Sequence, residues 1–271
     1  MKKFLNRLIF TALVVAFIGL GASFAYNLYG FVRYWMDERA ALGHAAVMQD
    51  IFHTHITDLQ AQGTMFPGET QGEEPTEVFI SPLPLAREKT GNDNIVAYIH
   101  IEGTNISNVV MHYSDNAFYL NHDMYRNPNV NGSLFLDYAN SPNFGDRNSI
   151  IYGHNMRNGT KFHDLRHFMN RDYFNDHRFI NIITDTGVLT YEAFAAFQAR
   201  TYFEYIQVYF QDDDDFQALL DELQARSVHN TDISPSVSDR ILILSTCTNT
   251  AADARFVIAA KLICTGTAIL T

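Results

Sequence analysis

The sequence predicts a mostly β domain, a closed or nearly closed β-barrel, preceded by one apolar membrane-spanning helix. Aromatic residues, which favour strands, are frequent, with 21 Phe and 14 Tyr. From residue 95 onward, short apolar runs alternate with turns rich in Gly, Asn, Asp and Pro. A barrel is the natural way to hold so many short strands, because closure removes exposed sheet edges.

The N-terminus has the pattern of a membrane anchor. Lys2, Lys3 and Arg7 precede an uncharged apolar run over residues 8–26. The run is close to the roughly 20 residues that cross a bilayer, and the preceding charge predicts an N-terminus inside and an exported remainder. A cleaved signal peptide is the alternative, since residues 23–25 loosely fit a cleavage site. The apolar part of a signal peptide is usually shorter, so we favour the anchor.

Three segments follow from these patterns. Residues 1–26 form the cytoplasmic tip and anchor, and residues 27–77 form a helical extension that ends in a linker. Residues 63–77 gather Gly, Pro, Glu and Thr, which is typical of a linker. Residues 78–271 form the β domain.

The β domain carries a series of strand candidates, each bounded by turn residues. They are residues 78–80, 95–101, 109–112, 133–137, 148–152, 179–183, 189–198, 240–246 and 255–264. The last two are almost continuously apolar, which predicts strands buried on both faces.

Two helices are expected in the connections of this domain. Residues 161–170 and 214–226 both repeat apolar residues at helical spacing. The acidic run 212–215 begins the second helix. We interpret it as charge that suits a helix N-terminus rather than as a metal site.

Composition excludes some classes of function. The chain of 271 residues allows one sizeable domain plus an anchor. A net charge of −11 argues against a nucleic-acid partner, which requires a basic surface. Two cysteines do not form a disulfide framework, so an exported thiol requires a chemical explanation.

Three residues stand where they can support thiol chemistry. Cys247 directly follows an apolar strand, and His154 ends another strand before a Gly/Asn-rich loop. Arg255 opens the next strand, so a short turn can bring it beside Cys247. Because an unperturbed thiol is mostly protonated at neutral pH, Cys247 needs a nearby base or cation. We expect Cys247 to be the nucleophile, His154 the acid and base, and Arg255 the oxyanion or substrate-positioning group.

The motifs around these residues resemble class B sortases, cysteine transpeptidases of Gram-positive bacteria. The resemblance rests on Ile-Leu-Ser-Thr-Cys-Thr at residues 243–248 followed by Arg255, and on Ile-Tyr-Gly-His-Asn-Met at residues 151–156. Residues 97–104, 114–120 and 131–138 also resemble class B members, as do the helical extension and the helix before the Cys247 strand.

This resemblance implies a sortase barrel of about eight strands and a specific reaction. The enzyme would cleave a C-terminal sorting motif of secreted proteins after a Thr, through a thioacyl intermediate. A cell-wall peptide amine would then resolve that intermediate. Cys247, His154 and Arg255 match the family's catalytic positions, and Ser245 and Thr246 would lie beside the substrate. The helix over residues 214–226 would help to wall the groove, and no cofactor is implied.

Two other functions remain open from the sequence. A pilin-polymerising sortase would use the same chemistry with a protein lysine, but residues 63–77 lack the lid motif that such enzymes often carry. A membrane-tethered binding module without activity is the other alternative. The intact set of Cys247, His154 and Arg255 argues against it.

Other cysteine and histidine residues are not expected to form sites. The pairs His53/His55 and His163/His167 each supply only two ligands, with no Cys or third His nearby in the sequence, so we expect no metal site. Cys264 lies in the last apolar strand, where we expect it to be buried. A disulfide with Cys247 would disable the nucleophile.

Overall fold

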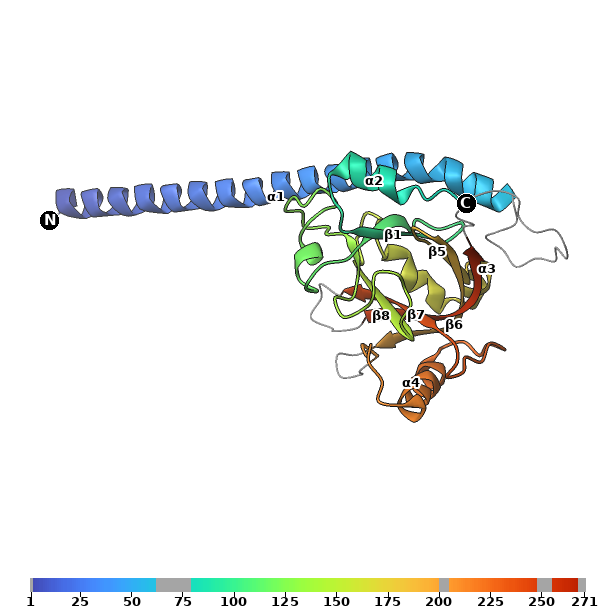
Figure 1. The fold of residues 1–271 in the computed structure, drawn as a ribbon. Helices are drawn as coiled ribbons and strands as arrows, with labels where there is room; N and C mark the ends of the chain where they lie inside the picture. The colour runs from blue at the N-terminus through green and yellow to red at the C-terminus, as the bar shows by residue number, and fades with distance from the viewer. Residues whose placement is uncertain (1, 62–78, 200–204, 248–254, 268–271) are drawn as a thin grey trace. The chain divides into compact units, whose positions relative to one another are not determined.

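The computed structural model describes residues 2–61, 79–199, 205–247 and 255–267. Within these ranges, eight strands close into a barrel in the order β1-β2-β3-β4-β7-β8-β6-β5, and β5 pairs back to β1 (Figure 1). The strands are β1 (Ile95–His100), β2 (Ser107–Met111), β3 (Leu134–Leu136), β4 (Asn148–His154), β5 (Phe179–Ile183), β6 (Gly187–Ala199), β7 (Ile241–Cys247) and β8 (Arg255–Thr267). The predicted mostly β barrel of about eight strands is confirmed.

Two of the strand pairs are parallel, β2 with β3 and β4 with β7, and the others are antiparallel. A parallel pair needs a long crossover between its strands. The crossover from β4 to β7 contains β5, β6 and the helix α4 (Asp213–Arg226). Residues far apart in the sequence therefore meet where β4 and β7 end.

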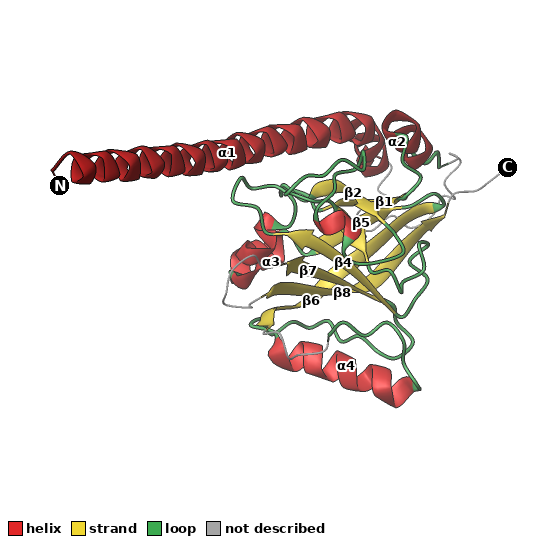
Figure 2. Cartoon of the chain, turned by 90° about the vertical axis from the view of Figure 1, so that its left-hand side faces the viewer, coloured by secondary structure: helices red, strands yellow, loops and turns green. Residues whose placement is uncertain are grey.

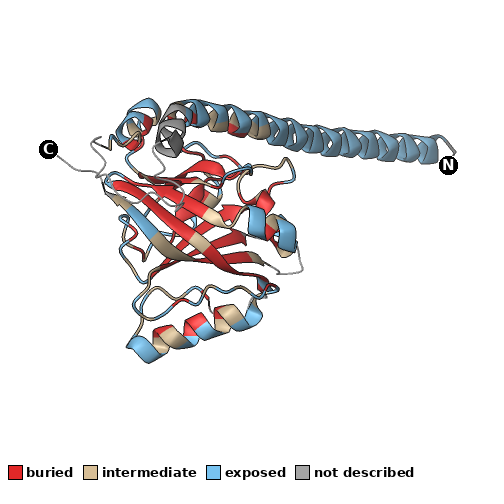
Figure 3. Cartoon of the chain, turned by 90° about the vertical axis from the view of Figure 1, so that its right-hand side faces the viewer, coloured by how far each residue is buried: buried red, intermediate tan, exposed pale blue. Residues whose placement is uncertain are grey.

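Most of the barrel wall is buried on both faces, as Figure 3 shows for the strands, and the second half of β8 is more exposed. Alternate residues belong to two apolar clusters, which follows from the two-residue period of a strand. One cluster contains Ile150, Ile243 and Val257 and packs with residues of three helices. The other contains Ile151, Leu244 and Ile258 and includes Phe162 and Phe168 from the β4–β5 connection. The near-continuous apolar sequence of β7 is explained by burial on both sides.

The N-terminal helix α1 (Lys2–Ala61) is continuous, but its residues fall into two compact units, Met1–Ala41 and Leu42–Thr271. Its N-terminal part is long and apolar enough to cross a membrane, with a mean hydropathy of 2.3 over the best window and none of that window buried. Its later part belongs to the barrel unit, where Phe52 stacks on Tyr98 with ring centroids 3.7 Å apart. The segment boundaries at residues 26 and 77 stay predictions, and the linker at residues 63–77 lies outside the described residues.

A short helix, α2 (Leu83–Thr90), was not predicted, and the strand expected at residues 78–80 is wrong where it can be examined. Phe79 and Ile80 lie in neither a helix nor a strand. Leu83 lies between two prolines, which are compatible with the first turn of a helix.

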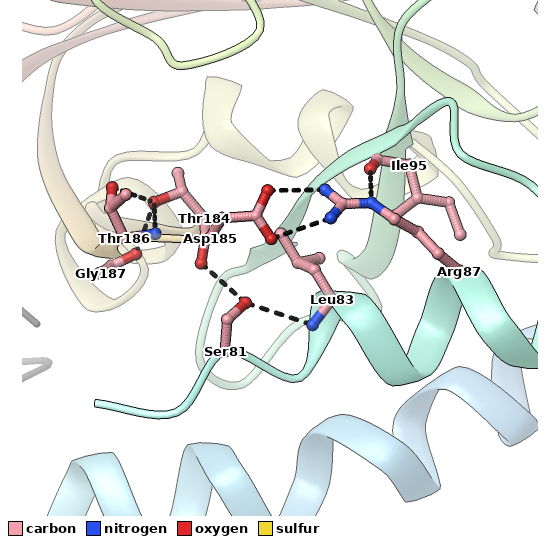
Figure 4. Close-up of polar contacts among 8 residues, drawn as sticks. All are labelled: Ser81, Leu83, Arg87, Ile95, Thr184, Asp185, Thr186 and Gly187. Carbon is pink, nitrogen blue, oxygen red and sulfur yellow. Dashed lines mark hydrogen bonds and ion pairs between the residues drawn. The ribbon is translucent and has the colours of Figure 1, made fainter. Parts of the chain in front are cut away.

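Polar contacts fix α2 and the segment before it to the β5–β6 turn and to the start of β1 (Figure 4). Arg87 donates to both carboxylate oxygens of Asp185 at 3.0 and 2.8 Å, and its Nε donates to the Ile95 carbonyl at 2.8 Å. The Ser81 hydroxyl donates to the Thr184 carbonyl at 3.0 Å. A bidentate arginine pair fixes geometry more than it adds stability when it is exposed, so these contacts set the position of α2.

Helix α4 confirms the helix expected before the Cys247 strand. Asp212 caps it by accepting a hydrogen bond from the Asp215 backbone at 2.9 Å. The acidic run is thus explained by the helix terminus. The apolar side of α4, which includes Phe216 and Leu220, packs into the first apolar cluster. Figures 1 and 2 show α4 and α2 on opposite sides of the barrel.

The expected short helix over residues 161–170 is a 3-10 helix, η2 (His163–Met169), and an α-helix, α3 (Arg171–Asp176), follows it. Asn170 caps α3 by accepting from the Tyr173 backbone at 3.0 Å. The expectation that Cys264 is buried is wrong. This cysteine is free and exposed, because β8 is buried only over its first half.

Candidate active site

The parallel pairing of β4 with β7 brings His154 and Cys247 together in the backbone. The register runs from Asn148 opposite Ile241 to His154 opposite Cys247, without a shift. Neighbouring strands lie about 4.8 Å apart. The two residues predicted to act in thiol catalysis therefore occupy adjacent positions at the ends of two buried strands.

The antiparallel pairing of β7 with β8 brings in Arg255. Ser245 pairs with Val257, and the Phe256 backbone N–H donates to Thr246 Oγ1 at 2.9 Å. Continued by two residues, the same register sets Arg255 opposite Cys247. All three predicted residues thus converge at one end of the β4-β7-β8 sheet, beside the turn 248–254, which lies outside the described residues.

The His154 ring is held in a defined orientation. Its Nε2 lies 2.7 Å from the Leu120 carbonyl oxygen. Because a carbonyl only accepts, Nε2 must donate, so in the neutral ring the lone pair is on Nδ1. Nδ1 is buried and has no hydrogen-bond partner among the described residues. It is the ring nitrogen left for proton exchange.

Burial lowers the pKa of His154. The hydrogen bond to Leu120 opposes this effect, and the positive charge of Lys161 adds to it. A lowered pKa favours the neutral imidazole at neutral pH. The group is therefore mainly a base at rest, and its protonated form is the minor one.

A polar cluster that sequence reasoning missed lies near His154. Burial lowers the pKa of Lys161 to about 8, while Asp123 raises it. Asp123 is buried, and its Oδ2 lies 3.6 Å from Nδ1 of His44 in α1. Lys161 also forms a β-bridge with Asn155, and the Phe162 N–H donates to the His154 carbonyl at 3.0 Å. The loop after His154 thus folds back, so that Lys161 and Phe162 contact the backbone of residues 154 and 155.

A second buried polar group supports the same strand ends. Tyr152 donates to Asp137 Oδ2 at 2.9 Å, and Asn116 donates to the same oxygen at 2.9 Å. Burial and Asp137 raise the pKa of Tyr152, and Arg255 is near enough to oppose them. Asp137 lies in the segment 131–138, which was noted only for its family resemblance. No spacing in the sequence indicated that it would meet Tyr152.

Ser245 and Thr246, expected beside the substrate, are fully buried. Ser245 Oγ lies 2.7 Å from the Tyr205 hydroxyl, and Thr246 Oγ1 accepts from Phe256. These contacts tie β7 to its neighbours. Direct contact of either side chain with a substrate stays a prediction.

The chain is similar to known proteins in sequence and in fold. The Sortase domain family model matches residues 99–263. That range is more than half of the chain. The chain belongs to the sortase family.

Curated relatives and solved structures place this sortase in class B. It is 33% identical to sortase B of Staphylococcus aureus (strain NCTC 8325 / PS 47) over 174 residues, 64% of this chain and 71% of that protein. It is 36% identical to sortase B of Listeria monocytogenes serovar 1/2a (strain ATCC BAA-679 / EGD-e) over 159 residues, 58% of this chain and 63% of that protein.

Structural similarity extends over more of the chain. A Staphylococcus aureus sortase B–substrate complex matches with a TM-score of 0.72 and 29% identity, covering 84% of this chain and 98% of that one. Sortase B of B. anthracis in complex with AAEK1 matches with a TM-score of 0.70 and 25% identity, covering 84% and 99%. The protein is a class B sortase, and hence a cysteine transpeptidase.

Proposed function

We propose that this sortase cleaves a C-terminal sorting motif of secreted proteins and transfers them to an amine of a cell-wall peptide, with Cys247, His154 and Arg255 as its catalytic residues. The register that sets His154 opposite Cys247 carries the proposal. Position 247 continues the alternating series Ile241, Ile243 and Ser245, and position 154 continues Ile150 and Tyr152. Strand periodicity therefore puts both positions on the same face of the sheet.

The proposed reaction has two balanced halves. The Cys247 thiolate attacks the carbonyl carbon of the motif's Thr and a C–S bond forms. The C–N bond to the next residue breaks as the His154 imidazolium gives its proton to the leaving amine. The incoming amine then attacks the thioester, loses a proton to His154, and releases the thiolate. Both halves pass through an oxyanion, which the Arg255 guanidinium stabilises.

The electrostatics of His154 shape this mechanism. Proton donation to the leaving amine requires the imidazolium, whereas burial and Lys161 favour the neutral ring. Only a minor fraction of the enzyme then carries both the thiolate and the imidazolium at neutral pH. Arg255 is always charged and supplies positive charge without a proton.

We propose that the N-terminal part of α1 anchors the enzyme in the cell membrane by a single span. The support is the apolar helix itself, with Lys2, Lys3 and Arg7 at its N-terminal end. Under the positive-inside rule, this end stays in the cytoplasm and the barrel lies outside. The sorting-motif proteins and the wall amine are encountered there.

The test is cleavage of fluorogenic peptides of the Asn-Pro-x-Thr and Ser-Pro-x-Thr types by the full chain in detergent micelles. Cys247→Ala is the control, and its circular dichroism should match that of the wild type. We expect cleavage and a covalent acyl-enzyme in mass spectrometry only when Cys247 is present. Cleavage that persists in the variant would disprove the assignment of the nucleophile.

The resolving amine is tested in the same assay. Adding a short cell-wall peptide with a free amine should convert hydrolysis into transpeptidation, whereas a lysine-bearing pilin peptide should not. The opposite preference would favour the pilin-polymerising alternative. A folded enzyme without any cleavage would favour an inactive binding module.

A further inference from the structure

A cluster of three metal-binding side chains lies on η2, outside the candidate catalytic residues. His163, Asp164 and His167 each offer one ligand atom, and these atoms all lie within 4.8 Å of one another. The sequence predicts no metal site at the two histidines, because it shows no third histidine and no cysteine nearby. The structure supplies the third ligand as the adjacent carboxylate.

The environment of each side chain suits a bound ion. Nδ1 of His163 is buried and has no hydrogen-bond partner among the described residues. Leaving a buried polar nitrogen without a partner is unfavourable, because its lost hydration is not replaced. A metal ion at this nitrogen would satisfy it.

Asp164 is buried and already oriented. Its Oδ2 accepts a hydrogen bond from the Asn105 backbone at 2.8 Å, which fixes the carboxylate plane. Supporting hydrogen bonds of this kind orient the ligands of known metal sites. Among the described residues, Oδ1 has no hydrogen-bond partner, so one oxygen remains for a ligand.

His167 completes the group from the exposed side. Its ring lies 5.9 Å from that of His163 and 5.5 Å from that of Tyr173, centroid to centroid. Ligand atoms around one tetrahedral Zn²⁺ are about 3.3 Å apart, given metal–ligand distances of about 2 Å. His167 is exposed, so a rotation of its ring can shorten its distances to the other two ligand atoms. Solvent can then fill the remaining coordination positions.

We propose that His163, Asp164 and His167 bind a divalent late-transition-metal ion such as Zn²⁺. Two imidazole nitrogens and one carboxylate oxygen favour this class over Mg²⁺ and Ca²⁺, which prefer oxygen ligands. The proposal does not depend on the catalytic assignment.

Bound metal would stiffen the segment that follows His154. η2 begins directly after Phe162, whose N–H donates to the His154 carbonyl at 3.0 Å. Through Asp164 and Asn105, η2 also joins the β1–β2 turn. The ion would therefore restrain both contacts at once and raise the thermal stability of the barrel.

The test is Zn²⁺ titration by calorimetry of the full chain in detergent, after EDTA treatment and removal of any polyhistidine tag. The variants are His163→Gln, Asp164→Asn and His167→Gln. Asn at position 164 keeps an oxygen that can accept from Asn105. Cys247→Ala removes a competing thiol, and His53→Gln is a matched control, since His53 is an exposed histidine in α1.

We expect one Zn²⁺ per chain in the wild type, Cys247→Ala and His53→Gln proteins, and an affinity at least about tenfold weaker in each η2 variant. The melting temperature should rise with Zn²⁺ in the first group and much less in the second. Binding that is absent, or that survives in both His163→Gln and His167→Gln, overturns the proposal. His167 is exposed, so its variant remains informative if His163→Gln fails to fold.

Discussion

Gly153, the residue before His154, has no room for a side chain. A Cβ atom at this position would lie 2.8 Å from Phe162 Cδ2 and closer still to Leu134 Cδ2. Carbon atoms normally approach to about 3.5–4.0 Å, so in Gly153→Ala the Phe162 ring must retreat by roughly 1 Å. Both neighbours are fully buried in the same apolar cluster, where little space can absorb the shift.

Overpacking of this kind generally costs about 1–3 kcal/mol of unfolding free energy. For a unit of this size, each kcal/mol lowers the melting temperature by about 2–4 °C. We therefore expect Gly153→Ala to melt roughly 2–12 °C below the wild type. Because the Phe162 N–H donates to the His154 carbonyl, we also expect peptide cleavage to slow.

The assay is thermal unfolding followed by circular dichroism, together with kcat/KM for peptide cleavage. Gly43→Ala is the matched control: its Cβ would meet nothing within 4 Å, and alanine should favour the α1 helix. In a Phe162→Leu background, the cost of Gly153→Ala should fall by at least about 0.5 kcal/mol, because the crowded ring is gone. A Gly153→Ala protein as stable and active as the wild type would refute this account.

Three further predictions concern the polar groups around the strand ends. Lys161→Met removes a positive charge that lowers the pKa of His154, so the His154 ring should titrate at higher pH in an NMR titration. An unchanged titration midpoint would exclude an electrostatic effect of Lys161 on His154. Because the pKa of His154 is lower in the folded protein than its unfolded value of about 6.5, the neutral ring contributes stability that is fully present above about pH 6.5. This stability is lost as the pH falls from about 6.5 toward the folded pKa. In Lys161→Met the folded pKa is higher, so the melting temperature should fall less on acidification. Arg255→Lys should reduce kcat/KM nearly as much as Arg255→Ala if the guanidinium acts through bidentate hydrogen bonds. Full activity of the Lys variant would mean that the positive charge alone is sufficient. Tyr205→Phe leaves the buried Ser245 hydroxyl without its partner at 2.7 Å and should cost about 1–3 kcal/mol in chemical unfolding, and a neutral result would place water at that position.

Much of the barrel could be predicted because its strands carry strong local signals. The strand at Phe179–Ile183 has the bounds expected from its apolar run, and α4 begins within one residue of its expected start. The helix at residues 83–90 was missed and the predicted burial of Cys264 was wrong, because local sequence patterns do not report tertiary packing. The short helix α2 contains a proline, which is a poor helix former, and Cys264 lies in the second half of an apolar strand, where the residues are partly exposed.

The candidate site was predictable in part for the same reason. Cys247, His154 and Arg255 each stand at a strand end with a recognisable local motif. The contact that orients His154 has no such local motif. Leu120 contributes its backbone carbonyl, which every residue type has, so the sequence contains no signal for it. Asp123 meets Lys161 only through the tertiary fold, and Asp164 lies beside His163 as a carboxylate, whereas the sequence prediction considered only histidine and cysteine as a third ligand.

The parallel pairing of β4 with β7 also bears on when the enzyme becomes reactive. Contacts between distant parts of a chain form late in folding, since the intervening loop must first be closed. Here those contacts are the ones that set Cys247 beside His154 and close the barrel. Under the proposed export and catalytic role, an unfolded chain would carry an ordinary, slowly reacting thiol at position 247 until β7 pairs with β4. If Cys247 is the nucleophile as proposed, its activation is thereby coupled to completion of folding.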